Sequence, residues 1–239
     1  DLTNIAQQIC TSKGYVFIIK VGEGGFKETF KIEKNGIIIA LKVYRSNINI
    51  DRVEREINVM ANCNFPFIAR IDEFFKISIN NELYYCCLEE FLAGGTLQDR
   101  IDKGLINRKI IIDIGNILID TIEHLKSKKL IHRDIKPINI LFRNNEWHLV
   151  LTDFGIVRDL TQESITATYF NRGPGTNGFS PVEQMTNRKE LIGWRSDQFS
   201  CGITLGLAAT NLHPFDYIPD KLLKGEISTD FINAINLLK

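Results

Sequence analysis

The stretch that decides the fold of this chain is IHRDIKPINIL, at residues 131–141. A second string, Asp153-Phe154-Gly155, begins nineteen residues after Asp134. Together they place two carboxylates, an amide oxygen and an ammonium group on two neighbouring loops. One carboxylate can orient an attacking hydroxyl, the second carboxylate and the amide can hold Mg²⁺, and the ammonium can neutralise charge on a moving phosphoryl group. The two strings therefore indicate a phosphoryl-transfer site.

Two further motifs lie upstream of this pair. The segment Gly22-Glu23-Gly24-Gly25-Phe26 falls between two predicted strands, where glycines let backbone N–H groups approach phosphate oxygens. Taken alone it is as consistent with a tight hairpin, and its strand–turn–strand context argues against a Rossmann fingerprint. Lys42 interrupts an apolar strand. Such a lysine is usually solvated, but Glu56 on the next predicted helix can pair with it, with Glu54 as the competing residue.

Hydrophobic periodicity gives a β-rich first third and a mostly helical remainder. Asn35-Gly36 is a strong hairpin signal. We expect strands over 15–21, 29–33, 37–44, 67–77 and 83–88, with short strands near 140 and over 146–150. We expect helices over 51–62, along the apolar positions from 110 to 125, over 197–209 and from 231 to 238.

With these motifs the chain resembles the eukaryotic-type protein kinases along essentially its whole length. The resemblance implies an α+β, two-lobed kinase fold: a small β-rich N-lobe at 1–91, a hinge at 92–95 and a larger helical C-lobe at 96–239, with ATP in the cleft. Kinases of this type continue past the last predicted helix. We therefore expect the C-lobe to be cut short at its C-terminal end, as a fragment of a longer chain in preference to a shortened lobe.

The resemblance also implies roles for matching residues. Asp134 matches the catalytic base and Lys136 the phosphate-neutralising lysine, while Asn139 and Asp153 match the metal ligands. Lys42 would contact the α- and β-phosphates and pair with Glu56, Thr176 would hydrogen-bond Asp134 and Lys136, and Asp197 would fasten the catalytic loop. The residues expected to contact the nucleotide are Gly22, Glu23, Gly24, Gly25, Phe26, Thr29, Ala40, Lys42, Glu90, Leu92, Asn139, Leu141 and Asp153. The implied cofactors are ATP and Mg²⁺, with Mn²⁺ as an alternative metal.

Lysine two residues after Asp134 is the pattern of Ser/Thr kinases, so the expected reaction is transfer of the γ-phosphoryl group of ATP to Ser or Thr hydroxyls of protein substrates. A pseudokinase or scaffold module that binds nucleotide without efficient catalysis is the alternative. Small-molecule phosphotransferases with a related fold rank lower, because they usually lack the segment from Gly175-Thr176 to Glu183.

Three positions depart from the family pattern. Lys27 replaces the third loop glycine, and we expect its side chain to point to solvent. Pro181-Val182-Glu183 stands where Ala-Pro-Glu is usual, so only the glutamate is kept. Glu89 occupies the place of the apolar gatekeeper next to the hinge. A buried carboxylate should be paired, and we expect its partner to be Lys42 or ordered water.

The loop between Asp153 and Glu183 carries five hydroxyl groups, on Thr161, Ser164, Thr166, Thr168 and Tyr169. In the related kinases an arginine at the place of Arg133 often binds a phosphate on this loop, and Arg172 could add a second cation. We predict autophosphorylation within 161–169, with Thr166 and Thr168 favoured. The alternative is that these hydroxyls merely keep a surface loop soluble.

Composition restricts the remaining classes of partner and location. The 29 basic and 29 acidic residues balance, with a pI of about 7.1, which argues against a protein that binds nucleic acid through a basic surface. Five scattered cysteines without a C-x-x-C pair indicate reduced thiols. No apolar run approaches the ~20 residues of a membrane helix, and no secretion signal opens the chain. We expect a cytoplasmic enzyme with protein substrates, without a membrane segment in this fragment, and with flanking domains in a longer chain.

Overall fold

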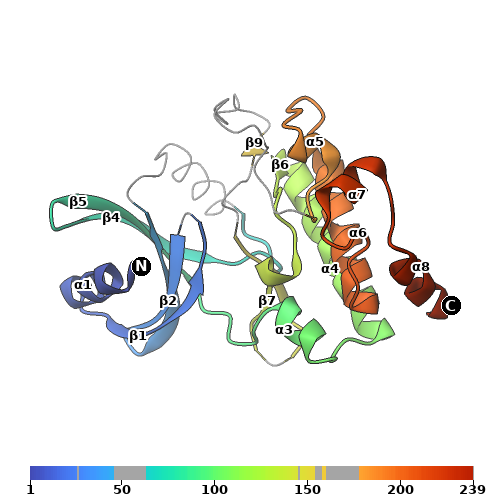
Figure 1. Ribbon diagram of the computed structural model, residues 1–239. Helices are drawn as coiled ribbons and strands as arrows, with labels where there is room; N and C mark the ends of the chain where they lie inside the picture. The colour runs from blue at the N-terminus through green and yellow to red at the C-terminus, as the bar shows by residue number, and fades with distance from the viewer. Residues whose placement is uncertain (26, 46–62, 145, 154–157, 160–177, 239) are drawn as a thin grey trace. The chain divides into compact units, whose positions relative to one another are not determined.

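The computed structural model describes residues 1–25, 27–45, 63–144, 146–153, 158–159 and 178–238 (Figure 1). The chain divides into two compact units. The first contains Asp1–Asn64 and Ala69–Leu92, and the second contains Phe65–Ile68 and Ala93–Lys239.

The first unit is built on a five-stranded antiparallel sheet with the order β1-β2-β3-β5-β4. The strands are β1 (Val16–Glu23), β2 (Lys27–Lys34), β3 (Ile37–Tyr44), β4 (Ile71–Ile79) and β5 (Glu82–Glu90). Asn35 and Gly36 both have positive φ, at 53° and 79°, as a two-residue hairpin turn of the primed type requires. The predicted hairpin is therefore confirmed. Asn80 and Asn81 make the same kind of connection between β4 and β5.

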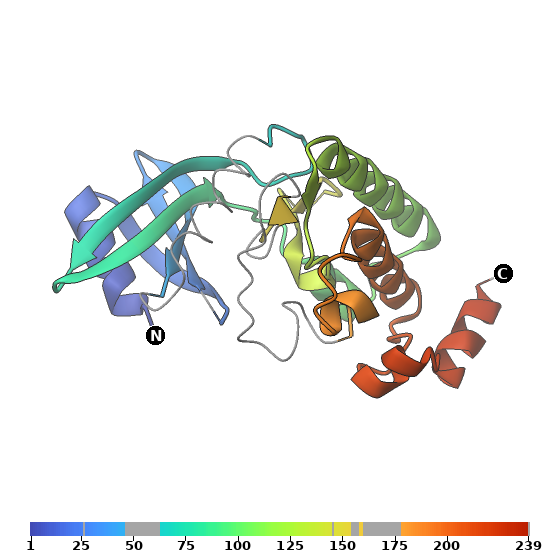
Figure 2. The same cartoon turned by 90° about the horizontal axis from the view of Figure 1, so that it is seen from above.

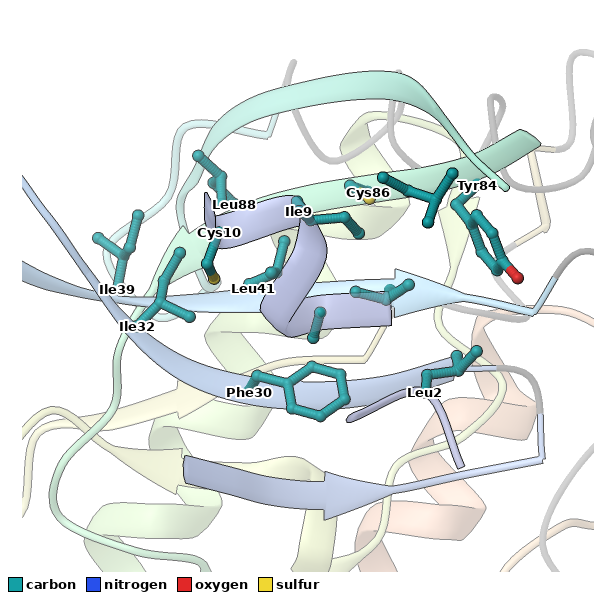
Figure 3. Close-up of a cluster of buried hydrophobic side chains, with 13 residues drawn as sticks. Leu2, Ile9, Cys10, Phe30, Ile32, Ile39, Leu41, Tyr84, Cys86 and Leu88 are labelled. Carbon is teal, nitrogen blue, oxygen red and sulfur yellow. The ribbon is translucent and has the colours of Figure 1, made fainter. Parts of the chain in front are cut away.

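A helix that the sequence reading did not predict covers one face of this sheet. It is α1 (Thr3–Lys13), and its buried residues Ala6, Ile9 and Cys10 pack into a cluster with apolar side chains of β2, β3, β4 and β5 (Figure 3). The spacing of Leu2, Ala6, Ile9 and Cys10 is helical and could have revealed it.

The sheet therefore has two different faces. In β3 the side chains of Ile39, Leu41 and Val43 belong to the cluster under α1, so Ala40 and Lys42 point to the opposite face because side chains alternate along a strand. The alternation in β5 places Leu88 under α1 and Glu89 on the opposite face. The arrangement therefore places Ala40, Lys42 and Glu89 on the face away from α1.

Most of the predicted strands are present within a residue or two, but two predictions need comment. The strand predicted over 67–77 begins only at Ile71, because Phe67 and Ile68 instead pair with Leu151 in the second unit. The helix predicted over 51–62 lies outside the described residues.

The second unit is mainly helical. Its two long helices, α4 (Arg108–Ser127) and α6 (Trp194–Thr210), pack side by side (Figure 2). The predicted apolar spacing of α4 is confirmed, since Ile114, Leu118 and Leu125 are buried. The other helices are α3 (Leu97–Asp102), the 3₁₀ turn η1 (Pro137–Asn139), α5 (Val182–Met185), α7 (Pro219–Lys224) and α8 (Thr229–Leu237).

Short strands connect these helices and carry the loops of interest. The hairpin of β7 (Ile140–Phe142) and β8 (Leu149–Leu151) follows η1, and β6 (Leu130–Ile131) pairs with β9 (Arg158–Asp159). The strand predicted over 146–150 is therefore β8, and it begins later than predicted.

Arg100 of α3 fastens the β7–β8 hairpin to the start of the unit. Its Nη2 atom donates to the carbonyl oxygens of Gly94, Asn144 and Glu146 at 3.0–3.3 Å, and its guanidinium lies 3.5 Å from the centre of the Phe142 ring. Burial lowers the pKa of Arg100, but an arginine remains charged in proteins. Throughout the described part of the chain, no helix is long and apolar enough to cross a membrane.

Candidate active site

Residues 131–141 form a loop between β6 and β7 whose backbone is held by Asp197 of α6. The Oδ2 atom of Asp197 accepts from the N–H of His132, and its Oδ1 atom accepts from the N–H of Arg133, both at 2.8 Å. Burial raises the pKa of Asp197 to about 6, although these two hydrogen bonds favour its charged form. The expected attachment of the loop to this helix is present.

Arg133 has a strained backbone that is held from a second side. Its φ of 71° lies in the left-handed region, which costs a non-glycine residue about 1–3 kcal/mol. Its carbonyl oxygen accepts a hydrogen bond of 2.6 Å from Nε2 of Gln184 in α5. Asp197 and Gln184 thus fix the peptide groups on both sides of Arg133. The sequence reading did not identify Gln184, because nothing in its local sequence marks a partner 51 residues away.

His132 connects the loop to the residue before Asp153. Its Nδ1 atom accepts from the N–H of Asp134 at 3.2 Å, so the remaining proton is on Nε2, which lies 3.2 Å from the carbonyl oxygen of Thr152. Burial lowers the pKa of His132 to about 4. The ring is therefore neutral at pH 7, and both of its nitrogens are used to position backbone.

Asp134, Lys136 and Asn139 meet in space. The Lys136 ammonium lies 2.9 Å from Oδ2 of Asp134, and Nδ2 of Asn139 donates to the same oxygen at 2.9 Å and to the Asp134 carbonyl at 2.8 Å. Two donors on one carboxylate oxygen fix the orientation of the carboxylate. The structure therefore brings together three of the predicted site residues.

Asn139 and Asp153 are brought close by the β7–β8 hairpin. Ile140 pairs with Leu151, and the N–H of Thr152 donates to the carbonyl of Asn139 at 3.0 Å. Thr152 therefore lies opposite Asn139, and Asp153 is the next residue along the chain. Asp153 itself has a φ of 67°. The left-handed conformation of Asp153 ends the extended backbone that follows β8, at the residue that is expected to bind the metal.

The donors of Asn139 and Asp153 suit a hard cation. The amide nitrogen of Asn139 is committed to Asp134, which leaves the amide oxygen as the ligand, and Asp153 adds a carboxylate. Mg²⁺ prefers oxygen ligands and is usually held by one or two protein groups together with substrate phosphates. Among the described residues no group of three or more His, Cys, Asp or Glu could hold a metal ion by itself. The two residues fit a metal that arrives with a phosphate-bearing substrate.

In the first unit, the face away from α1 holds a second group of predicted residues. On this face, Lys42 of β3 lies directly between Thr29 of β2 and Cys87 of β5. Ala40 of β3 pairs directly with Glu89 of β5. Direct partners in antiparallel strands share a face. Lys42 forms an ion pair with Glu89, whose side chain is 3% exposed. Glu89 thus has the partner that was expected of it. Glu56, the other predicted partner of Lys42, lies outside the described residues.

The glycine-rich segment connects β1 and β2. Gly22 pairs with Thr29, and the N–H of Gly24 donates to the carbonyl of Lys27 at 2.9 Å. The prediction that Lys27 points to solvent is wrong: the residue is 9% exposed, and its ammonium lies 5.3 Å from the centre of the Tyr44 ring. The reason is the strand register, which pairs Lys27 directly with Tyr44.

The remaining predicted residues lie as follows. Glu23 ends β1, and Gly25 follows it in the turn to β2. Glu90 ends β5, where its Oε1 atom accepts from the N–H of Arg70 at 2.9 Å, and the buried Leu92 closes the first unit. Leu141 is the half-buried middle residue of β7. Phe26 and Thr176 lie outside the described residues, as do the five hydroxyl-bearing positions of 161–169.

Comparison with known proteins places this arrangement in a family. The sequence pattern of the protein kinase domain matches residues 15–236. The serine/threonine-protein kinase PknA of Nostoc sp. is 29% identical over 84% of this chain and 37% of its own length. A probable serine/threonine-protein kinase PknB of Lactococcus lactis is 31% identical, over 84% of this chain and 32% of its own. The serine/threonine-protein kinase cds1 of Schizosaccharomyces pombe is 27% identical, over 91% and 49%.

This chain therefore spans between about a third and a half of the length of these relatives. The family match covers nearly the whole of the described structure and begins just after α1. Its α+β content, with a β-sheet unit followed by a helical one, agrees with the predicted fold class. The chain belongs to the protein kinase domain family.

Proposed function

We propose that this chain is the catalytic domain of an ATP-dependent protein kinase that transfers the γ-phosphoryl group of ATP to Ser or Thr hydroxyls of protein substrates. The observation that carries the proposal is the Asp134–Lys136–Asn139 cluster, held on a loop whose backbone is fixed by Asp197. The family membership and the printed names of the relatives support it. The division into an N-lobe at 1–91, a hinge at 92–95 and a C-lobe at 96–239 is part of this proposal.

Asp134 is the group that orients the substrate hydroxyl and accepts its proton. Its carboxylate is fixed through Oδ2 by Lys136 and Asn139, and fixed orientation of a base contributes to rate because the reacting groups need not be ordered during the reaction. Lys136, 2.9 Å from Asp134, is placed to neutralise charge on the phosphoryl group as it passes to the hydroxyl.

The bound metal would be Mg²⁺, with Mn²⁺ as an alternative, held by Asn139 and Asp153. When bound, such an ion supplies positive charge that offsets the charge of the phosphate oxygens. The residues of the chain contribute the geometry: Asn139 presents its amide oxygen because its nitrogen is bound to Asp134, and the β7–β8 pairing sets Asp153 beside it. Lys42, paired with Glu89, would contact the α- and β-phosphates.

The preference for Ser and Thr follows from Lys136, two residues after the base. Thr176 is proposed to add hydrogen bonds to Asp134 and Lys136. The enzyme is proposed to act in the cytoplasm. Protein substrates, and further domains in a longer chain, also belong to the proposal.

The test is a phosphate-transfer assay with labelled ATP, Mg²⁺ and a generic basic protein, followed by identification of the modified amino acids. Asp134→Asn should reduce turnover by on the order of 10²-fold or more and leave ATP affinity nearly unchanged. Asp120→Asn, on the exposed side of α4, is the matched control and should retain full activity. Near-normal turnover of Asp134→Asn would remove Asp134 as the base, and ATP binding without turnover by the unaltered chain would identify a nucleotide-binding pseudokinase.

A further inference from the structure

Glu28 is an unusual residue for the second strand of a glycine-rich hairpin, because its side chain is completely buried. It is 0% exposed and lies on the face of the sheet that α1 covers, next to Phe30 of the same cluster. A buried carboxylate needs partners, and Glu28 has several.

Two of the partners are cations at the two strands that flank β2 in the sheet. Lys20 of β1 lies 2.8 Å from Oε2 of Glu28, and Arg45, directly after β3, lies 3.0 Å from Oε1. The same two cations also reach Glu23, at 2.8 Å and 3.6 Å. Glu23 and Glu28 are direct cross-strand partners, and like charges in this position repel one another. Lys20 and Arg45 therefore join a repulsive pair into one charge cluster. Asp1 also belongs to this cluster, since its carboxylate lies 3.6 Å from Lys20 and its ammonium group 3.8 Å from Glu28.

A bulge makes this cluster possible. Lys20 and Glu23 are three residues apart, so in a regular strand their side chains would point to opposite faces. The register of β1 against β2 shifts between Lys20 and Gly22, and one extra residue restores both side chains to the same face. The bulge and the charge cluster thus lie immediately before Gly24 and Gly25, at the base of the turn.

The third partner comes from the segment before the family match. The backbone N–H of Leu2 donates to Oε2 of Glu28 at 3.0 Å. Leu2 is the N-cap residue directly before α1, and α1 precedes the matched residues 15–236. Burial alone would raise the pKa of Glu28, but hydrogen bonds from Lys20 and from the Leu2 N–H outweigh it and lower the pKa. Glu28 is therefore ionised and ties the start of α1 to the base of the glycine-rich turn.

We propose that Glu28 is a positioning residue for nucleotide phosphates: it couples the docking of α1 to the conformation of the glycine-rich turn and so strengthens binding of the phosphate-bearing part of ATP. This inference rests on the proposed function, in which the turn covers the phosphates. The physical basis is pre-organisation, since a turn whose base is already ordered loses less conformational freedom when the ligand binds.

The test compares ATP with adenosine, which lacks the phosphates. Glu28→Gln keeps the shape of the side chain and removes its charge. Lys20 and Arg45 are partly exposed, so water can solvate them in the variant. We expect the KM for ATP and its dissociation constant by titration to rise about five- to tenfold, with kcat within about twofold and the affinity for adenosine unchanged. Glu73→Gln is the matched control, because it breaks the Lys34–Glu73 ion pair of the same sheet, formed by residues outside the turn.

A second pair of variants tests the link to α1. Leu2→Pro removes the N–H that Glu28 accepts, because proline has no backbone N–H, whereas Leu2→Ala keeps that N–H and shortens the same side chain. We expect Leu2→Pro to bind ATP about threefold more weakly than Leu2→Ala, at a temperature well below the unfolding midpoint of both.

Several outcomes would overturn the inference. Unchanged ATP affinity in Glu28→Gln would refute it, and an equal loss of affinity for ATP and adenosine would show general loosening of the unit instead of an effect on phosphates. Equal ATP affinity of Leu2→Pro and Leu2→Ala would remove α1 from the coupling. Because binding is measured by titration as well as by turnover, an unaltered chain that binds ATP without transferring phosphate would overturn the proposed function and still test this inference.

Discussion

Lys42 and Glu89 form a buried ion pair within one face of one sheet, where the resemblance to kinases would place an apolar residue beside the lysine. Diagonal positions on adjacent strands brought them together, since Ala40 pairs with Glu89 and Lys42 with Cys87. Removing one member of a buried pair takes a charged partner away from the other and is destabilising. Glu89 is therefore expected to matter more for the stability of the unit than for the chemistry of phosphoryl transfer.

Glu89→Met should lower the free energy of unfolding by about 1–3 kcal/mol and leave ATP turnover within about one order of magnitude, because Lys42 would still be present to contact the phosphates of ATP. Urea unfolding and initial rates measure the two effects. Glu73→Met, in a half-exposed ion pair of the same sheet, should cost less than about 1 kcal/mol. A Glu89→Met protein as stable as the unaltered chain would contradict the assigned pairing.

His132 should make the unfolding free energy depend on pH. Burial lowers the folded-state pKa of His132 from 6.5 to about 4. Between these pH values the unfolded chain binds a proton on this ring that the folded chain does not bind. The unfolding free energy is therefore unaffected by protonation of His132 above pH 6.5 and decreases as the pH falls from 6.5 to 4. Between these pH values the chain should lose about 3 kcal/mol relative to His132→Gln, from the linkage of one pKa unit to about 1.4 kcal/mol.

Denaturant unfolding at a series of pH values measures this difference. His148→Gln, which replaces an exposed histidine, serves as the control and should run parallel to the unaltered chain. If the curves of His132→Gln and the unaltered chain stayed parallel from pH 6.5 to 4, the ring would not be held neutral by burial.

Among the secondary-structure elements, the β7–β8 hairpin depends on a close approach of backbone at Gly94. The N–H of Gly94 donates to the carbonyl of Phe142 at 2.8 Å, and the N–H of Phe142 donates to the carbonyl of Gly95 at 3.0 Å. A Cβ atom on Gly94 would lie 1.8 Å from the carbonyl oxygen of Asn144, and this neighbour is backbone that cannot turn away. The hairpin that carries Asn139 and Asp153 on its two ends thus needs glycine at this position.

Gly94→Ala should therefore destabilise the second unit by more than about 2 kcal/mol and reduce turnover as the hairpin shifts. Gly202→Ala in α6 is the control, because a Cβ there meets nothing within 4 Å and alanine in a helix should add about 0.5–1 kcal/mol. Thermal unfolding of both variants decides the matter, and a Gly94→Ala protein as stable as Gly202→Ala would show that the approach is looser than the structure indicates.

For the whole molecule, the prediction of control by autophosphorylation within 161–169 still stands untested, because those residues lie outside the described structure. Arg133 is the proposed partner of a phosphate in this segment. In the structure Asp197 and Gln184 fix the peptide groups on both sides of Arg133. A cation on a fixed backbone loses less freedom on binding a phosphate, so a phosphate on Thr166 or Thr168 should raise activity several-fold by charge-assisted hydrogen bonds.

Mass spectrometry after incubation with Mg·ATP, together with rates before and after, tests this control. Replacement of Thr161, Ser164, Thr166 and Thr168 by Ala and of Tyr169 by Phe should hold the enzyme at its unphosphorylated rate. An active enzyme that carries no phosphate in 161–169, or a fully active replacement variant, would refute the switch.

The sequence by itself determined the family, the strand and helix pattern of most of the chain, and the cluster at Asp134, Lys136 and Asn139. These residues lie within six positions of one another on one loop, so local spacing suffices to predict that they meet. Asn35-Gly36 likewise specified its hairpin, because positive φ at both turn positions is a local property of these residue types.

Only the tertiary structure decided which partners come from distant strands and helices. Lys27 turned inward because the register of β2 and β3 sets it opposite Tyr44, and Gln184 reached Arg133 across 51 residues. Glu28 acquired its partners from β1, from the end of β3 and from the start of α1. Register and docking are set by the burial of whole faces and not by any one segment, so the neighbours of a side chain follow from the packed sheet and not from its local sequence.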